Sequence, residues 1–302
     1  DLLFGATGQS LLGGLDQALA RRTNRANQDY FELGKLNNQR APGASSVVNL
    51  SQQASLSLVT DSLAKILQTA EPPLSNEKKA RLHEINREIF THESRLQQAF
   101  LPQEAGVLQS LQQQLDIQFS ARSEITERGF QSIQQIRVDI NIAYQQVEQR
   151  LPQTEISRID NLLNELGEIL SELQKTLDQQ QEDELERLDE QIDKILLNAL
   201  SARDQRKLES YFEELETLEQ KAEKSRLSAA EEKRLEELEE RIDILFEKAE
   251  RSLNPIDRLQ LNFLALAREA VYLQPSLSAQ QRTSVQQLNV QFEQLSIVSA
   301  EI

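Results

Sequence analysis

Apolar residues recur along most of the chain in alternating steps of three and four, the spacing of helices that bury one stripe. The longest such pattern covers residues 155–199. Its stripe reads Ile156, Ile159, Leu163, Leu166, Leu170, Leu173 and Leu177, then resumes one residue out of step at Leu185, Leu188, Ile192 and Leu196. As one continuous helix this stretch would be roughly 65–70 Å long. The pattern predicts an all-α chain, an elongated antiparallel bundle of long amphipathic, coiled-coil-like helices.

Leu-Ser and Leu-Pro pairs mark the predicted helix boundaries, because Ser is a favoured N-cap and Pro is favoured in a first helical turn. The pairs begin at Leu74, Leu101, Leu151, Leu200, Leu227 and Leu277. Two of the Ser residues have the form of capping boxes, Ser228-x-x-Glu231 and Ser278-x-x-Gln281. We predict short helices at about 47–71, 75–99, 201–225 and 278–298, and long ones at about 103–150, 154–199 and 229–274. Asn254-Pro255 is expected to kink or restart the last long helix.

The spacing of these six pairs repeats along the chain. The intervals are 27, 50, 49, 27 and 50 residues, so Leu74, Leu101 and Leu151 each recur 126 residues later. Self-similarity at a fixed period is the signature of duplicated helical units. We therefore predict an internal duplication with a period of about 126 residues, with copy one at residues 47–176 and copy two at residues 177–302. The 155–199 stretch would then join the two copies.

Residues 1–46 differ from the rest of the chain in being rich in glycine. The glycines are Gly5, Gly8, Gly13, Gly14 and Gly34, followed by the run Ala41-Pro42-Gly43-Ala44. An amphipathic segment at about residues 9–36 carries a small basic cluster, Arg21, Arg22 and Arg25, in an otherwise acidic chain. We interpret this region as an arm for docking and assembly, whose three arginines contact the acidic surface of a neighbouring subunit.

Charge and composition narrow the classes of partner and compartment. The net charge of −16 disfavours nucleic acid and anionic membrane surfaces, which need concentrated basic residues. No apolar run reaches the roughly 18–20 residues of a transmembrane helix. The chain has no Cys, Met or Trp. Missing Met suits an exposed, long-lived assembly, because Met oxidation disrupts packed cores. We expect an extracellular or cell-surface protein that is secreted after removal of a leader, although chance or lineage bias would equally explain the missing Met.

Candidate catalytic and metal-binding motifs are incomplete in this sequence. His83 and His92 are nine residues apart, whereas two ligands on one helix face need a spacing of three or four. The segment from His83 to Arg87 begins like an HExxH zinc motif but has Arg87 where the second His belongs. We therefore expect a protein that is not an enzyme, with no catalytic, cofactor-binding or metal-binding residues and no cofactor.

These features together favour a structural protein. We expect a self-assembling helical subunit of an extracellular filament, sheath or surface appendage, whose partners are copies of itself. In composition alone the chain is similar to bacterial flagellins, which are helical at their termini and poor in Cys and Trp; their terminal sequence patterns are not present here. The alternative is a non-enzymatic rod-like adaptor, adhesin stalk or secretion-associated spacer that binds other proteins through helical faces. Gln-rich runs such as 112–114 and 179–181 fit either uncharged helix surface or packing between subunits.

Overall fold

The computed structural model describes residues 47–120 and 124–297, in which helices alternate with short connections. Ten α-helices and one short 3-10 helix occupy the described residues, which contain no strand. The predicted all-α class is confirmed. None of these helices combines the length and the apolar character that crossing a membrane requires.

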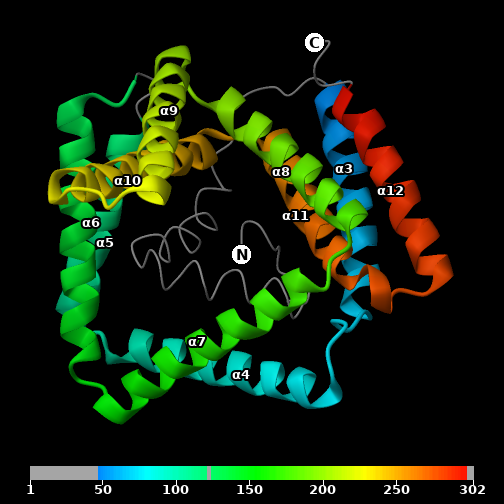
Figure 1. Cartoon of the computed structure of the whole chain (residues 1–302), viewed down its shortest axis with the longest axis horizontal. Helices are drawn as coiled ribbons and strands as arrows, with labels where there is room; N and C mark the ends of the chain where they lie inside the picture. The colour runs from blue at the N-terminus through cyan, green and yellow to red at the C-terminus, as the bar shows by residue number, and fades with distance from the viewer. Residues whose placement is uncertain (1–46, 121–123, 298–302) are drawn as a thin grey trace. The chain divides into compact units, whose positions relative to one another are not determined.

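The helices follow one another with short connections (Figure 1). Their bounds are α3 Val47–Gln68, α4 Asn76–Ala99, α5 Pro102–Ser120, α6 Glu127–Glu148, α7 Gln153–Lys175, α8 Gln179–Ala199, α9 Ala202–Lys224, α10 Ala229–Ser252, α11 Pro255–Leu273, η2 Gln274–Ser276 and α12 Ala279–Ile297. The four predicted short helices correspond to α3, α4, α9 and α12, with ends within a few residues of those expected.

Side-chain caps begin several helices where the sequence predicts them. Ser75 and Ser201 each accept a hydrogen bond from the backbone N–H three residues on. Ser228 forms the complete capping box with Glu231. At α12 the backbone N–H of Gln281 donates to Ser278 Oγ at 3.2 Å, and the Ser278 N–H donates back to Gln281 Oε1 at 2.9 Å. Such caps satisfy N–H groups that have no partner inside the helix.

The prediction of one helix over residues 155–199 is wrong, because α7 ends at Lys175 and α8 begins at Gln179. Asp178 and Gln181 start the new helix by a reciprocal cap. The Gln181 N–H donates to Asp178 Oδ1 at 2.9 Å, and the Asp178 N–H donates to Gln181 Oε1 at 3.0 Å. This polar box interrupts the apolar stripe at the point where the stripe slips by one residue.

The other two long helices are also divided, so those predictions are wrong as well. Residues 103–150 form α5 and α6, and Thr126 begins α6 by accepting a hydrogen bond from the Gly129 N–H at 3.2 Å. Residues 229–274 form α10 and α11. Asn254 caps α11 by accepting from the N–H groups of Ile256 and Asp257, with Pro255 in the first turn. The expected restart at Asn254-Pro255 is therefore confirmed.

Contacts between helices divide the described chain into two compact units. The first contains α3, α4, the end of α6 from Asn141, α7, α11 and α12, with α8 as far as Ile192. The second contains most of α5, the first part of α6, and α9 and α10, within the ranges Val107–Ile140 and Asp193–Leu253. The units group helices by their contacts and do not compare residues 47–176 with residues 177–302. The predicted duplication therefore stays a prediction.

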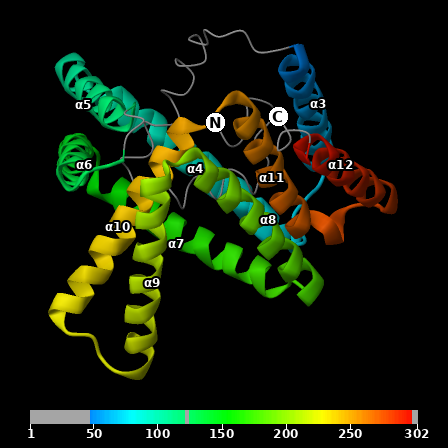
Figure 2. The same cartoon turned by 90° about the horizontal axis from the view of Figure 1, so that it is seen from above.

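The core of the first unit forms where α11 packs against α3 and α12, as Figures 1 and 2 show. Phe263 of α11 stacks on Phe292 of α12, with ring centroids 4.2 Å apart and planes 9° apart. Leu56 and Leu63 of α3 are fully buried. Burial of such large apolar side chains supplies the main favourable free energy of a helical core.

Helices α4 and α7 of the first unit pack antiparallel and are joined by ion pairs. Arg81 donates two hydrogen bonds of 2.7 Å to the Glu165 carboxylate. Further pairs are Lys78 with Glu172, Arg158 with Glu88, and Arg95 with Glu155. Later residues of α4 pair with earlier residues of α7, which sets the antiparallel direction.

In the second unit α9 and α10 form an antiparallel hairpin, visible in Figure 2. Arg234 of α10 binds the Glu214 carboxylate of α9 through two hydrogen bonds of 2.7 and 2.8 Å. Deeper in the unit, Leu208 and Leu238 are fully buried. The guanidinium of Arg241 lies 5.1 Å from the ring centre of Phe130, a cation–π contact between α10 and α6.

Candidate functional site

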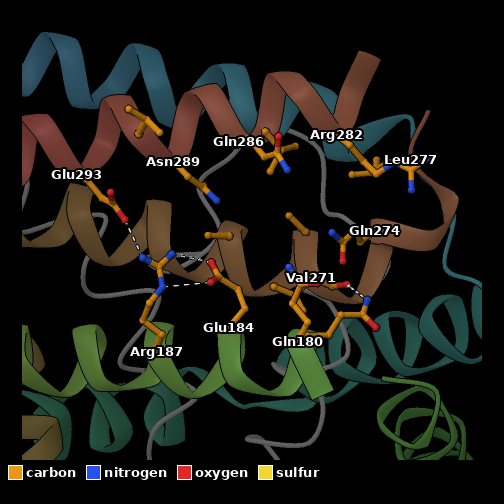
Figure 3. Close-up of a pocket in the computed structure, with 15 residues that line it drawn as sticks. Gln180, Glu184, Arg187, Val271, Gln274, Leu277, Arg282, Gln286, Asn289 and Glu293 are labelled. Carbon is orange, nitrogen blue, oxygen red and sulfur yellow. Dashed lines mark hydrogen bonds and ion pairs between the residues drawn. The ribbon is translucent and has the colours of Figure 1, made fainter. Parts of the chain in front are cut away.

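A polar cleft of about 320 Å³ lies in the first unit, lined by residues of α8, α11, η2 and α12 (Figure 3). The apolar part of its lining comes mainly from α11 and α12. These apolar residues are Ala267, Ala270, Val271, Leu277, Val285 and Val290. The volume is in the range of pockets that hold small ligands or a side chain of a partner protein.

The walls of the cleft carry amide and charged side chains. Gln180, Glu184 and Arg187 come from α8, and Gln286 and Asn289 come from α12. Arg187 reaches across toward α12, as Figure 3 shows, and donates to Glu293 Oε1 at 2.8 Å. It also donates to both oxygens of Glu184, at 2.7 and 3.1 Å. The hydrogen bonds that Arg187 donates to these two carboxylates, first Glu184 and then Glu293, raise the pKa of its guanidinium.

Two amides that line the cleft differ in their hydrogen bonding. Gln181 is 7% exposed and donates from Nε2 to the carbonyl oxygen of Val271 at 3.1 Å, which ties α8 to α11. Asn289 Oδ1 is buried and has no hydrogen-bond partner among the described residues. A buried acceptor without a donor is unfavourable. The cleft therefore suits a ligand that offers an N–H or O–H group over an apolar body.

The side chains that line the cleft can hold a ligand through hydrogen bonds and apolar contacts. Its lining consists of aliphatic, amide, arginine and glutamate side chains, and both glutamates are engaged by Arg187. Within residues 47–120 and 124–297, no three His, Cys, Asp or Glu side chains are grouped as metal ligands. His92 instead lies against α7, with its Nδ1 3.1 Å from Glu155 Oε1, and this hydrogen bond lowers the pKa of Glu155.

The second unit contains a buried charge network centred on Asp204, which is fully buried. Asp204 Oδ2 accepts from Lys248 Nζ at 2.7 Å and from Ser201 Oγ at 2.9 Å, and Oδ1 accepts from the Ile125 N–H at 3.0 Å. Lys248 is 3% exposed. A buried ion pair is tolerated when further hydrogen bonds satisfy its remaining atoms, as they do here.

The network extends to the adjacent residue of α10. Glu247 is 4% exposed, pairs with Arg137 of α6 and accepts from Arg251 Nη2 at 2.6 Å. Arg251 also pairs with Asp116 of α5 and lies over the ring of Phe119, 4.7 Å from its centre. These contacts join α5, α6, α9 and α10. Because cations engage its carboxylates, the network stabilises the unit rather than presenting a free base.

Glu250, beside this network, gives the protein a specific pH dependence. Burial, reinforced by the charge of Glu247, raises the pKa of Glu250 from 4.5 to about 7. Between those values the folded state holds a proton that the unfolded state releases, so stability falls as pH rises from about 4.5 to 7. Glu250→Gln should remove this part of the pH dependence, which we expect to be on the order of 2 kcal/mol. Urea unfolding of the wild type and the variant at pH 5 and pH 7 measures this difference. The same change in the free energy of unfolding between the two pH values in both proteins would contradict the prediction.

Arg21, Arg22 and Arg25, the predicted assembly residues, lie outside the described residues. The buried network and the cleft are additions that sequence reasoning missed. One signal for the network was available: Arg137 interrupts an apolar stripe that includes Ile133 and Ile140. The sequence contains no such signal for the cleft, because its walls come from helices about 100 residues apart.

Comparison with protein-family models, with curated proteins and with solved structures finds no match.

Proposed function

We propose that this protein is a non-enzymatic structural subunit that assembles with copies of itself through helical surfaces, as part of an extracellular filament, sheath or surface appendage. The observation that supports this most directly is the solvent side of α5. Every exposed residue within Pro102–Ser120 is uncharged, in a chain of which 27% is charged. Val107 and Ile117 on that side are 57% and 67% exposed. Exposed apolar residues on an uncharged surface are typical of protein interfaces.

An internal duplication is part of the same proposal, because repeated helical units suit an assembly. Helices α4, α5 and α7 begin 126 or 127 residues before α9, α10 and α12. The caps Ser75 and Ser201 are also matched at this interval. Their helices have different partners, since α4 packs on α7 and α9 packs on α10. Two copies of one sequence pattern would thus have diverged in tertiary packing.

The polar cleft favours a second candidate function, a non-enzymatic adaptor, adhesin stalk or spacer that binds a different protein. A side chain of a partner protein could insert here, with a donor group bonded to Asn289 Oδ1 and its apolar part against the apolar lining residues. The two candidates differ in their prediction for the purified chain. The adaptor would remain a monomer or dimer at rising concentration, whereas the subunit would form larger assemblies.

Deleting residues 1–46 is expected to abolish assembly, because the proposal assigns docking to this arm. Replacing Arg21, Arg22 and Arg25 together with Glu should weaken association, and raising salt from 0.1 to about 0.5 M should weaken the wild type, since exposed ion pairs are screened. The matched control changes the same three residues to Lys, which preserves the charge. Light scattering and electron microscopy at rising concentration measure these effects. Assembly that survives both the deletion and the charge reversal would exclude the arm as the docking element.

A further inference from the structure

Helix α6 has two heptad-spaced stripes on different faces. The inward stripe consists of Phe130, Ile133, Ile140, Tyr144 and Val147, each at most 5% exposed. The outward stripe consists of Gln131, Gln135, Val138, Ile142, Gln145 and Gln149, all exposed. An amphipathic helix at the surface normally presents charged residues opposite its buried face. A second stripe at heptad spacing is the pattern of a helix that contacts two partners.

The outward stripe is uncharged along its whole length of roughly 27 Å. Val138 and Ile142 at its centre are 49% and 46% exposed, and they are separated by one helical turn. The bordering carboxylate of Asp139 is half-buried and accepts from Gln135 Nε2 at 2.9 Å on the same helix. The helical geometry extends to the last position, because the Gln149 N–H donates to the Gln145 carbonyl at 3.0 Å.

We infer that the outward stripe of α6 binds the same stripe of a second copy, with the two helices antiparallel. The order of residues, two Gln, Val, Ile, two Gln, has the same chemistry in both directions. In an antiparallel pair centred on residue 140, Val138 lies opposite the Ile142 of the second copy, Gln135 opposite its Gln145, and Gln131 opposite its Gln149. A two-fold interface requires this self-complementarity, because the same pair of residues is in contact twice, once from each copy.

Charge and hydrogen bonding favour a second copy as the occupant. Each copy carries a net charge of −16, so two copies repel wherever charged faces meet. The α6 stripe lets them approach without placing carboxylates against each other along its centre line. Glutamine side chains both donate and accept, so opposed Gln pairs satisfy one another. The inference rests on the proposed self-assembly and specifies one contact of it.

Charge reversal at the centre of the stripe tests the contact. In the full chain, Val138→Glu with Ile142→Glu should raise the dissociation constant of the dimer at least about tenfold, because four carboxylates would then face one another. The control is Leu58→Glu, at a residue of a different helix, α3, that is 67% exposed. Sedimentation equilibrium measures association, and circular dichroism checks that helix content is retained. Unchanged association with retained helix content would overturn the inference and leave the proposed function in place.

Cysteine cross-linking tests the antiparallel register and does not depend on a loss of association. The chain has no Cys, so introduced thiols react without competition. Under mild oxidation the double variant Val138→Cys with Ile142→Cys should form disulfide-linked dimers, whereas each single variant should form few, because residue 138 faces residue 142. The control pair is Glu209→Cys with Glu213→Cys, two exposed positions on α9.

The other cross-linking outcomes separate the possible failures. Single variants that cross-link as well as the double variant would overturn the antiparallel arrangement. Absence of cross-links in a chain that still associates would overturn the α6 contact alone. A chain that is monomeric at every concentration would overturn both this contact and the proposed function. The same holds if a different protein, and not a second copy, binds the stripe.

Discussion

Replacing Lys248 with Met is expected to lower the free energy of unfolding by about 3–5 kcal/mol, the usual cost of leaving a buried charge without its partner. Lys248 Nζ lies 2.7 Å from Asp204 Oδ2, and the two side chains are 4% and 0% exposed. Met fills a similar volume, so the loss comes from the missing ammonium and not from a cavity. The Asp204 carboxylate would remain buried with hydrogen bonds from Ser201 and Ile125 alone compensating its charge.

A double-mutant cycle separates the ion pair from the packing around it. Asp204→Asn keeps an oxygen for the Ile125 N–H and removes the charge, so the variant with both substitutions should recover most of the loss caused by Lys248→Met. The exposed pair of Arg203 and Glu124 is the control, because the Arg203 side chain is 75% exposed. Arg203→Met should cost less than about 1 kcal/mol. Urea unfolding followed by circular dichroism measures all four variants, and a strictly additive cycle would show that the pair is not coupled.

Replacing Phe263 with Ala should destabilise the protein by about 3–5 kcal/mol, since a large side chain is removed from a packed core. Phe263 is 1% exposed and stacks on Phe292 at 4.2 Å, at the point where α11 meets α12. The cavity would lie where α12 packs on α11.

Phe90→Ala is the matched control, because this phenylalanine of α4 is 65% exposed. The same change there should alter the free energy of unfolding by less than about 0.5 kcal/mol. Thermal and urea unfolding of the two variants measures the difference. Similar losses for the two would mean that Phe263 contributes no more to the core than a surface side chain.

Helix ends were predictable where a side chain forms a local cap. Helices begin at the predicted positions Ser75, Ser201, Ser228 and Ser278. Each Ser side chain accepts a hydrogen bond from the N–H three residues on, and this contact depends on the local sequence alone. Asp178-x-x-Gln181 also forms a local cap, although the apolar stripe continues on both sides of it. A stripe identifies a buried face without excluding a change in helix direction. The prediction of one continuous helix over residues 155–199 was therefore wrong.

The candidate sites were less predictable than the helices. The cleft depends on Arg187 of α8 meeting Glu293 of α12, residues more than 100 positions apart, and no local pattern links them. For α6 the sequence contains both stripes, but the burial of Phe130 and the exposure of Val138 follow from which neighbours pack on the helix.

The sequence by itself determined the all-α class and the principal caps, because periodicity and capping act within a few residues along the chain. It also determined the acidic charge and the absence of Cys. Tertiary structure alone decided that α11 lies against α3 and α12, that Asp204 meets Lys248, and that Val138 and Ile142 of α6 are exposed. The physical reason is that an apolar stripe specifies burial without specifying its partner, and packing between distant helices selects that partner.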